Sequence, residues 1–234
     1  MKISHSKQQE IWDKEHTTPF VLPQMDSHEI SSGVLQFIGW LKEKGLGFSL
    51  RGIELGCGKG RNVIGLAKLG FEMSGIDFSP AAIKEAEKRS KEEGIETKTS
   101  FKVHDATLKW PFESDSFDFG IDCFATTDIE NSKGRKYAAD ELTRVIKKGG
   151  YLFAYLLSPE DEFHKKMTVQ SPAKERNSFL HPTTGKFEKT FDMDEILELY
   201  DKLKLTENRR LPKVVEFFGK NYNCFHHWVV FKKK

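Results

Sequence analysis

The sequence predicts an α/β fold in which helices cover both faces of a mostly parallel β-sheet. Two observations lead to this prediction. Short apolar runs alternate with amphipathic stretches of helical period between residues 51 and 157, and glycines or a serine–proline pair separate them. Repeated strand–helix units give a parallel sheet with right-handed crossovers. The expected architecture is a three-layer sandwich within a single domain, residues 1–234, since the length suits one α/β domain with insertions.

The elements follow from hydrophobic period and punctuation. Ser79 and Pro80 mark a helix start, with serine as the cap and proline in the first turn. Asp192 and Glu195 form a variant of the capping box ahead of another helix. Strands are expected at 51–55, 71–77, 99–104, 117–123, 151–157, 213–218 and 223–232. Five helices are expected. The first runs from residue 26 to about 45, and the second follows the first strand and ends at residue 70. The third begins at residue 79, the fourth covers 132–147, and the fifth begins at residue 192.

The loop after the first strand is the most informative segment. Gly56, Gly58 and Gly60 alternate there, directly before a helix. Glycine brings backbone N–H groups close to a ligand, because any Cβ would force the ligand outward. Dinucleotide enzymes read G-x-G-x-x-G, whereas this loop reads G-x-G-x-G. Glu54, two residues before the first glycine, favours a cationic ligand over a pyrophosphate.

Two more acids stand where predicted strands end. Asp77 ends the second strand, and Asp105 follows the third. The Asp77 carboxylate can accept hydrogen bonds from both hydroxyls of a ribose. Each acid taken alone is equally consistent with a loop acid or a helix cap. The placement of all three acids at one edge of a parallel sheet, where open α/β folds bind ligands, favours a nucleoside site.

The segment from Glu54 to Gly60 resembles motif I of class I S-adenosylmethionine-dependent methyltransferases. The resemblance implies a Rossmann-like fold whose seven-stranded sheet is mostly parallel, with an antiparallel last strand completed by the terminal hairpin. It also implies S-adenosylmethionine as the cofactor. In this family the glycine loop holds the methionine portion, and the nearby acid helps to organise the ammonium group. The cofactor-binding residues so implied are Glu54, Gly56, Cys57, Gly58, Gly60, Asp77, Phe78, Asp105 and Ala106.

Residues 122–128 occupy the place where members of this family position groups near the transferable methyl. Phe124 is expected to pack near the cofactor, and Asp128 to orient an acceptor amine. The alternative is that Phe124 belongs to the core and that Asp128 caps the helix that starts near Ser132. His164 and His181 are candidate bases, because imidazole titrates near neutral pH, although exposed histidines are common in such segments.

Two segments are expected to cover the site. Residues 1–48 form an N-terminal helical cover, in which Trp12 places an aromatic face near the sulfonium. Phe20 and Trp40 lie in the same cover, and ordinary packing explains Trp40 equally well. Residues 158–191 are polar and long for a featureless connection. They are interpreted as a lid insertion, with a disordered loop as the alternative.

Composition excludes several classes of protein. Lys and Arg number 37 against 35 Asp and Glu, so a strong nucleic-acid signature is missing. No apolar run is long enough to span a bilayer, which indicates no membrane partner and a cytoplasmic location. Cys57, Cys123 and Cys224 cannot all pair, in keeping with a reducing compartment. Cys224, His226 and His227 alternate as in a β-strand, so packing is favoured over metal ligation and no metal is expected.

The sequence therefore indicates an S-adenosylmethionine-dependent methyltransferase. The expected acceptor is an N, O or S atom of a small molecule, because no nucleic-acid module accompanies the domain. Methylation of RNA or protein is the first alternative, with Lys165, Lys166, Lys174 and Lys186 meeting phosphates or acids. A protein that binds S-adenosylmethionine without catalysing transfer is the second. The sequence leaves the acceptor and the oligomeric state open.

Overall fold

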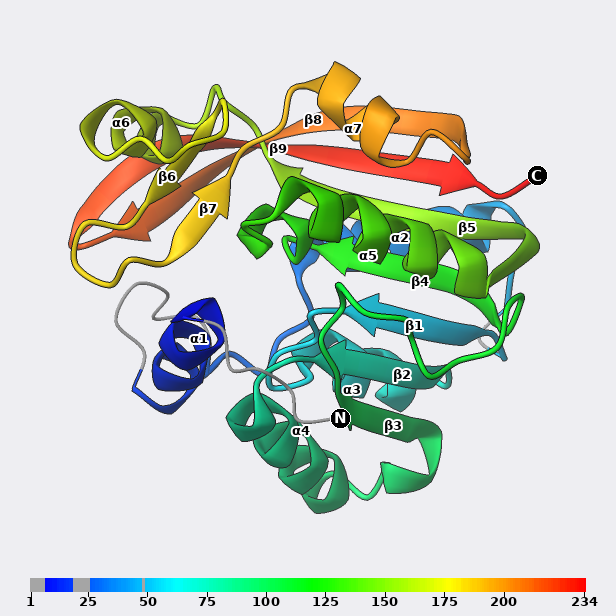
Figure 1. The fold of residues 1–234 in the computed structure, drawn as a ribbon. Helices are drawn as coiled ribbons and strands as arrows, with labels where there is room; N and C mark the ends of the chain where they lie inside the picture. Colours follow the sequence, from blue (N-terminus) through cyan, green and yellow to red (C-terminus); the bar gives the residue numbers. More distant parts are fainter. Residues whose placement is uncertain (1–6, 19–25, 48) are drawn as a thin grey trace.

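The computed structural model describes residues 7–18, 26–47 and 49–234, and it confirms the predicted α/β fold (Figure 1). Among these residues, seven strands form one sheet in the order β3-β2-β1-β4-β5-β9-β8. The first five strands pair in parallel, and β9 runs antiparallel to both β5 and β8. The strands are β1 (Arg51–Leu55), β2 (Glu72–Asp77), β3 (Thr99–Val103), β4 (Phe117–Cys123), β5 (Ile146–Leu157), β8 (Lys204–Phe217) and β9 (Lys220–Lys232).

Two buried cores lie on opposite faces of the sheet. Helices α2 (Ser32–Glu43), α3 (Arg61–Lys68) and α4 (Pro80–Glu92) cover one face. Helices α5 (Ser132–Val145) and α7 (Met193–Leu199) cover the other. Each central strand therefore buries both faces, which explains its nearly continuous run of apolar residues.

The predicted helix starts are largely confirmed. The Ser79 hydroxyl accepts a hydrogen bond from the Ala82 N–H at 3.1 Å, and Pro80 is the first residue of α4. Asp192 and Glu195 make the expected capping box on α7. The first apolar helix was placed too early, because α2 begins at Ser32 rather than at residue 26.

The connection from β3 to β4 contains no helix, and residues 104–116 cross one face as a loop. Trp110 anchors this loop and is only 1 % exposed. Its ring Nε1–H donates to the Ala106 carbonyl at 3.0 Å, and its backbone N–H donates to Glu141 of α5 at 2.7 Å. One large side chain thus covers sheet area that a crossover helix would otherwise bury.

The last two strands are longer than predicted. β8 was expected only from residue 213 and β9 from residue 223, but the two pair over their whole length from Lys204 to Lys232. Most β8 side chains are exposed, so the strand carries little hydrophobic pattern. Phe218 and Gly219 both have positive φ at the tip, as a tight hairpin turn requires.

Residues 158–191 are folded rather than a disordered loop. They contain α6 (Glu162–Gln170) and the hairpin of β6 (Ser178–Leu180) with β7 (Phe187–Lys189). α6 packs against the far end of the β8–β9 hairpin (Figure 1). Phe163 stacks on Phe217 with 4.0 Å between ring centroids. A small apolar core holds this part together: Phe163, Met167, Phe179, Phe217 and Cys224.

The N-terminal helix α1 (Lys7–Thr17) was not predicted as an element. It lies between the β6–β7 hairpin and α4 (Figure 1). The Gln8 amide donates to the Gly185 carbonyl at 3.0 Å and accepts from the Phe187 N–H at 3.1 Å. Gln9 donates to the Phe78 carbonyl at 2.7 Å. The predicted cover 1–48 includes residues 1–6, 19–25 and 48, among them Phe20, which lie outside the described residues.

Replacing Tyr200 by phenylalanine is expected to destabilise the fold. The Tyr200 hydroxyl donates to the Asp122 carboxylate at 2.8 Å, and both side chains are buried. Loss of one donor to a buried carboxylate should lower the free energy of unfolding by about 1–3 kcal/mol, measured by urea denaturation. Tyr137→Phe, at a residue 41 % exposed, is the control. Equal stability of the two variants would show that the bond to Asp122 contributes nothing.

Candidate functional site

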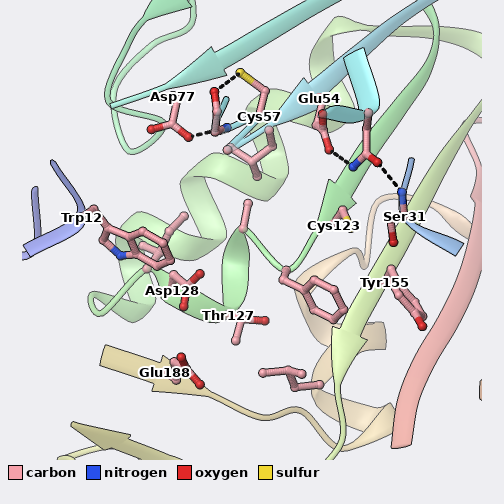
Figure 2. Close-up of a pocket in the computed structure, with 18 of the residues that line it drawn as sticks. Trp12, Ser31, Glu54, Cys57, Asp77, Cys123, Thr127, Asp128, Tyr155 and Glu188 are labelled. Atoms are coloured by element: carbon pink, nitrogen blue, oxygen red, sulfur yellow. Dashed lines mark hydrogen bonds between the residues drawn. The ribbon is translucent and has the colours of Figure 1, made fainter. Parts of the chain in front are cut away.

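A cavity of about 730 Å³ lies at the carboxyl ends of the parallel strands (Figure 2). Leu55, Ile76, Cys123 and Leu157 contribute to its wall from β1, β2, β4 and β5. α1 and the 158–191 segment close other sides. Its volume falls within the roughly 300–1,000 Å³ that is usual for sites of small ligands.

The glycine loop forms one wall of the cavity as bare backbone. Gly56 and Gly58 have φ values of 62° and 53°, which other residues rarely adopt. A Cβ at Gly56 would come within 2.6 Å of the Ala125 side chain, and one at Gly58 within 3.3 Å of His16. Gly60 differs, because it does not line the cavity. It precedes α3 with a φ of 79°, and a Cβ there would meet Phe101 at 3.0 Å, so Gly60 packs closely against β3.

Glu54 presents a buried carboxylate to the cavity, and it is 2 % exposed. Its Oε1 accepts from the Asn62 amide at 2.6 Å, and Asn62 in turn accepts from the Ser31 N–H (Figure 2). The Oε2 atom is buried without a hydrogen-bond partner. Burial raises the pKa of Glu54 to about 8, although the hydrogen bond from Asn62 acts in the opposite direction. A ligand ammonium would satisfy this unpaired oxygen, so the residues present fit S-adenosylmethionine at this end.

Asp77 is held rigidly at the end of β2. Its Oδ2 accepts from the Gly58 N–H and its Oδ1 from the Ser79 N–H, both at 2.9 Å (the Gly58 bond is drawn in Figure 2). Burial raises its pKa to about 6, while these backbone bonds lower it. Each carboxylate oxygen keeps a further lone pair for a ligand hydroxyl. Phe78 lines the cavity beside it.

Asp105 and Ala106 line the cavity beyond β3. Asp105 Oδ1 accepts from the backbone N–H of Thr107 at 2.9 Å and from its hydroxyl at 2.7 Å. The Ala106 carbonyl accepts from the Trp110 ring. The loop that follows the third strand is therefore fixed from within the protein. The three predicted acids do share one cavity.

The other predicted contact residues differ in role. Cys57 is 5 % exposed and packs on Gly75, where a Cβ would approach its sulfur to 2.6 Å. Phe124 has φ of 67°, unusual for a bulky residue. It packs against Tyr155 and His226 at centroid distances of 4.9 and 5.1 Å. Strain of this kind concentrates at functional sites.

Trp12 reaches into the cavity from α1, as predicted, and is 8 % exposed. The ammonium of Lys186 lies 4.4 Å from the centroid of its ring. The cation that the structure places on this ring therefore belongs to the protein itself, which the sequence did not indicate. The indole Nε1–H is buried without a hydrogen-bond partner.

A set of buried ionisable side chains forms the other end of the cavity. We call it the charged cluster: Asp128, Asp161, His164, Lys186 and Glu188. His164 donates through Nδ1 to Asp161 at 2.6 Å and through Nε2 to Glu188 at 3.0 Å. Lys186 pairs closely with Glu188, and its Nζ lies 3.8 Å from Asp128 Oδ1.

Burial alone would lower the pKa of His164, but its hydrogen bonds to Asp161 and Glu188 raise it to about 9. Burial would raise the pKa of Glu188, but Lys186 and His164 bring it below its ordinary value. Burial raises the pKa of Asp128 to about 8, opposed by Lys186. His164 and Glu188 are therefore both charged at neutral pH.

A methyltransferase-domain family model matches residues 53–150, which carry the glycine loop and the strands beside it. The chain contains a class I methyltransferase domain. Norajmaline N-methyltransferase of Rauvolfia serpentina is 34 % identical over 100 residues, covering 42 % of this chain and 32 % of that protein. Methyltransferase GfsG of Streptomyces halstedii is 32 % identical over 101 residues, covering 43 % and 35 %. The match thus spans about a third of the length of these curated relatives.

A crystal structure of a SAM-dependent methyltransferase from Methanosarcina mazei resembles the whole methyltransferase domain. It is 26 % identical, has a TM-score of 0.71, and covers 82 % of this chain and 96 % of its own. The structural similarity to this methyltransferase therefore includes the whole sheet as well as the glycine loop.

The structure separates the candidate bases of the methyltransferase domain. His164 is in the cavity, but it is positively charged and its two ring nitrogens are occupied, so it has no free lone pair to accept a proton. His181 does not line the cavity and stacks near Phe218 instead. The suggestion that Asp128 caps α5 is wrong, because Asn131 accepts from the Gly134 N–H and forms that cap.

Several site residues were not predicted, among them Asn62, Asp161 and Glu188. Lys186 was considered only as a contact to phosphates or acids of a macromolecule, but it is 2 % exposed. In the sequence these residues look like ordinary polar residues of a surface segment. The alternation of Lys186 and Glu188 about Phe187 was the one usable signal, since it is that of a short strand.

Among the described residues, no three His, Cys, Asp or Glu side chains are grouped so that they could hold a metal ion. The three cysteines are free. His226 shares a hydrogen bond with the Tyr155 hydroxyl at 3.0 Å. No helix in the described part of the chain is long and apolar enough to cross a membrane.

Replacing His164 by glutamine is expected to change how stability depends on pH. The folded pKa of His164 is about 9, above the ordinary 6.5, so its stabilising effect is complete below pH 6.5 and is lost as pH rises through 9. At about 1.4 kcal/mol per pKa unit, the advantage of wild type over His164→Gln should shrink by an amount on the order of 3 kcal/mol. Urea denaturation at pH 6 to 10 measures this. The exposed His28→Gln is the control, and a parallel pH profile for wild type and His164→Gln would contradict the assignment.

Proposed function

We propose that this protein transfers the methyl group of S-adenosylmethionine to an N, O or S atom of a small molecule. The methyltransferase family of residues 53–150 implies the cofactor. One observation carries the proposal: a single cavity has a nucleoside-type end at Glu54, Asp77 and Asp105 and a second, chemically different end at the charged cluster. A cavity with two chemically different ends can bind two reactants so that their reacting atoms meet between the ends.

In this proposal Glu54 receives the ammonium group, the Gly56–Gly58 backbone the methionine portion, Asp77 the ribose and Asp105 with Ala106 the adenine. The bound cofactor supplies an electrophilic methyl group. The protein then contributes alignment of the two reactants and exclusion of water. Phe124 and Tyr155 provide aromatic surface between the two ends. Residues 158–191 are proposed as a lid over the cavity, because four members of the charged cluster belong to this segment: Asp161, His164, Lys186 and Glu188.

The structure favours a small acceptor over a macromolecule. Of the four lysines considered for phosphate contact, Lys186 is buried and paired with Glu188, so it cannot meet a nucleic-acid backbone. Lys165, Lys166 and Lys174 are exposed. In addition, α1 and the β6–β7 hairpin are joined by the two Gln8 hydrogen bonds at one side of the cavity, which restricts the space for a folded partner.

Incubation with methyl-labelled S-adenosylmethionine and a fractionated cell extract tests the reaction. We expect label in the small-molecule fraction, at a rate that is insensitive to salt. Label in RNA that disappears steeply as salt rises would favour phosphate-mediated recognition instead. Label in protein would contradict a small acceptor. Cofactor binding without label in any fraction would indicate a protein that only binds S-adenosylmethionine.

Replacing Asp77 by alanine should weaken cofactor binding. The change removes a carboxylate that can accept two hydroxyl hydrogen bonds and that also holds the Gly58 N–H in place. Bonds to a charged group contribute about 1.5–3 kcal/mol each, so we expect S-adenosylmethionine affinity to fall at least about tenfold in titration calorimetry. Asp194→Ala, at an exposed acid of α7, is the matched control. Unchanged affinity of Asp77→Ala would exclude the ribose role.

A further inference from the structure

We propose that the charged cluster end of the cavity recognises an amine, with Asp128 Oδ1 and Thr127 Oγ1 accepting hydrogen bonds from the amino group of the methyl acceptor. This inference rests on the proposed function, because it names the class of acceptor for the same cavity.

The charge balance leaves one acid in excess. The cluster has two cations, His164 and Lys186, and three acids. His164 donates to Asp161 and Glu188, and Lys186 pairs closely with Glu188. Asp128 lies 3.8 Å from the Lys186 ammonium, beyond hydrogen-bond distance. Asp161 and Glu188 thus already compensate the two cations, so a cationic ligand would supply the counter-charge for Asp128 when its carboxyl group ionises.

Three buried oxygens at this end lack a hydrogen-bond partner: Oδ2 of Asp161, the residue before α6, and one oxygen each on Thr127 and Asp128. Thr127 is 1 % exposed, and its hydroxyl oxygen has no hydrogen-bond partner. Asp128 Oδ1 is buried and has none either. Both residues belong to the short helix η3 (Thr126–Asp128) and line the cavity. In Figure 2 Asp128 lies between Trp12 and Glu188, with Thr127 next to it. A buried oxygen without a donor is costly, and an amino group supplies the donors.

The framework around η3 is rigid. Asp122 is fully buried and accepts from the Thr126 N–H at 3.1 Å and from the Thr126 hydroxyl. On the other side, the Arg135 guanidinium donates to the carbonyls of Thr126 and Ile129. These bonds fix the backbone on which Thr127 and Asp128 are placed, so the two oxygens form a preorganised pair of acceptors.

At the charged cluster, an anionic acceptor finds no cation without an acid. Arg61 also lines the cavity, but it is the first residue of α3, beside the glycine loop rather than at this end. The Lys186 ammonium is already paired with Glu188, and Lys59 is paired with Asp26. Lys213 lines the cavity from an exposed position on β8. Within the charged cluster as described, each cation therefore has its own acid, and a ligand carboxylate would be added to the three acids already there.

The remaining wall indicates the rest of the acceptor. Leu157, Val215 and Phe217 line the cavity near Cys224, and Phe124 with Tyr155 lines it toward the glycine loop. Apolar surface of this kind holds a hydrocarbon body, while the few polar groups fix its orientation. The acceptor class is therefore a primary or secondary amine that carries an apolar carbon skeleton.

The chemical step balances with Asp128 as the proton acceptor. An ionised Asp128 removes a proton from the arriving ammonium and leaves a neutral amine. The nitrogen lone pair forms the new N–C bond, and the electron pair of the broken S–C bond stays on sulfur. The positive charge passes from sulfur to nitrogen, and the proton on Asp128 then leaves to solvent.

The pH dependence follows from the groups that face Asp128. Its pKa is raised to about 8 by burial, against the effect of Lys186. His164, with a pKa of about 9, and Glu188, with a lowered pKa, keep their charges between pH 6 and 8, and burial keeps His16 neutral there, with its pKa near 4. Amine affinity should therefore rise from pH 6 to 8 as Asp128 ionises. The charged or titratable groups that act on Asp128 are Lys186, Glu188, His164 and Asp122. Glu15 and His16 act on Lys186, and Arg135 contacts the backbone of η3.

Calorimetry on the full chain saturated with S-adenosylhomocysteine tests the inference. The probes are phenethylamine and octylamine, each with its carboxylate counterpart, hydrocinnamate and octanoate. We expect at least one amine to bind about tenfold or more tightly than its counterpart. Asp128→Asn should remove this preference and weaken amine binding about tenfold or more, and should abolish the rise with pH. Asp194→Asn is the matched control.

Thr127→Val provides a second variant, because it removes only the hydroxyl and nearly conserves volume. It should weaken amine binding by a smaller factor, without changing the response to pH. Carboxylates that bind as well as the amines, or amine affinity unchanged by Asp128→Asn, would overturn the inference. Transfer of label in the extract experiment to an oxygen or sulfur atom would do the same and leave the proposed function intact. Failure of wild type to bind S-adenosylhomocysteine would instead overturn the proposed function.

Discussion

The mutual compensation of buried charges is the constraint on which one side of the cavity depends. Lys186, His164 and Glu188 are each at most 5 % exposed. His164 lies in α6, Glu188 lies in β7 and Lys186 directly precedes β7, and no regular sheet pairing connects these elements to the main sheet. Ions placed in such surroundings are stable only when paired with good geometry. The pairs of His164 with Asp161 and Glu188, and of Lys186 with Glu188, lie within the 158–191 segment, so they hold α6 and the β6–β7 hairpin to each other. Movement of the segment away from the sheet would instead separate Lys186 from Asp128 and Glu175 from Arg135.

The opposite side of the cavity is held by backbone. Asp77 accepts N–H groups from Gly58 and Ser79, so one carboxylate ties the glycine loop to the start of α4. The parallel register of β1 with β2 brings these loops to the same edge. One side of the cavity is thus built by strand order and glycine conformation, which many sequences share, and the other by specific ion pairs. The first side is suited to a cofactor that many proteins share, and the second to an acceptor that is specific to this protein.

The sequence predicted the parts of the molecule whose signals are local. Strand β4 was placed at its observed bounds, and Ser79 was correctly identified as a cap, because apolar runs and capping residues act over a few positions. The shared cavity of Glu54, Asp77 and Asp105 followed from strand ends meeting at one edge. The charged cluster could not be predicted, since burial of Lys186 depends on Trp12 of α1 and on Asp128, which are both distant in the sequence. Because most side chains of β8 are exposed, its sequence lacks a hydrophobic pattern that would indicate the length of the strand.

Helix α1 touches both ends of the cavity. Gln9 holds the Phe78 carbonyl beside Asp77, while Gln8 holds Gly185 and Phe187 beside Lys186. Family matching covers residues 53–150 only. A shortened protein trimmed to that match would keep the glycine loop but lose the helix that joins the two ends, together with Trp12. For this chain, the smallest unit with a complete ligand chamber is therefore considerably larger than the segment by which its family is identified.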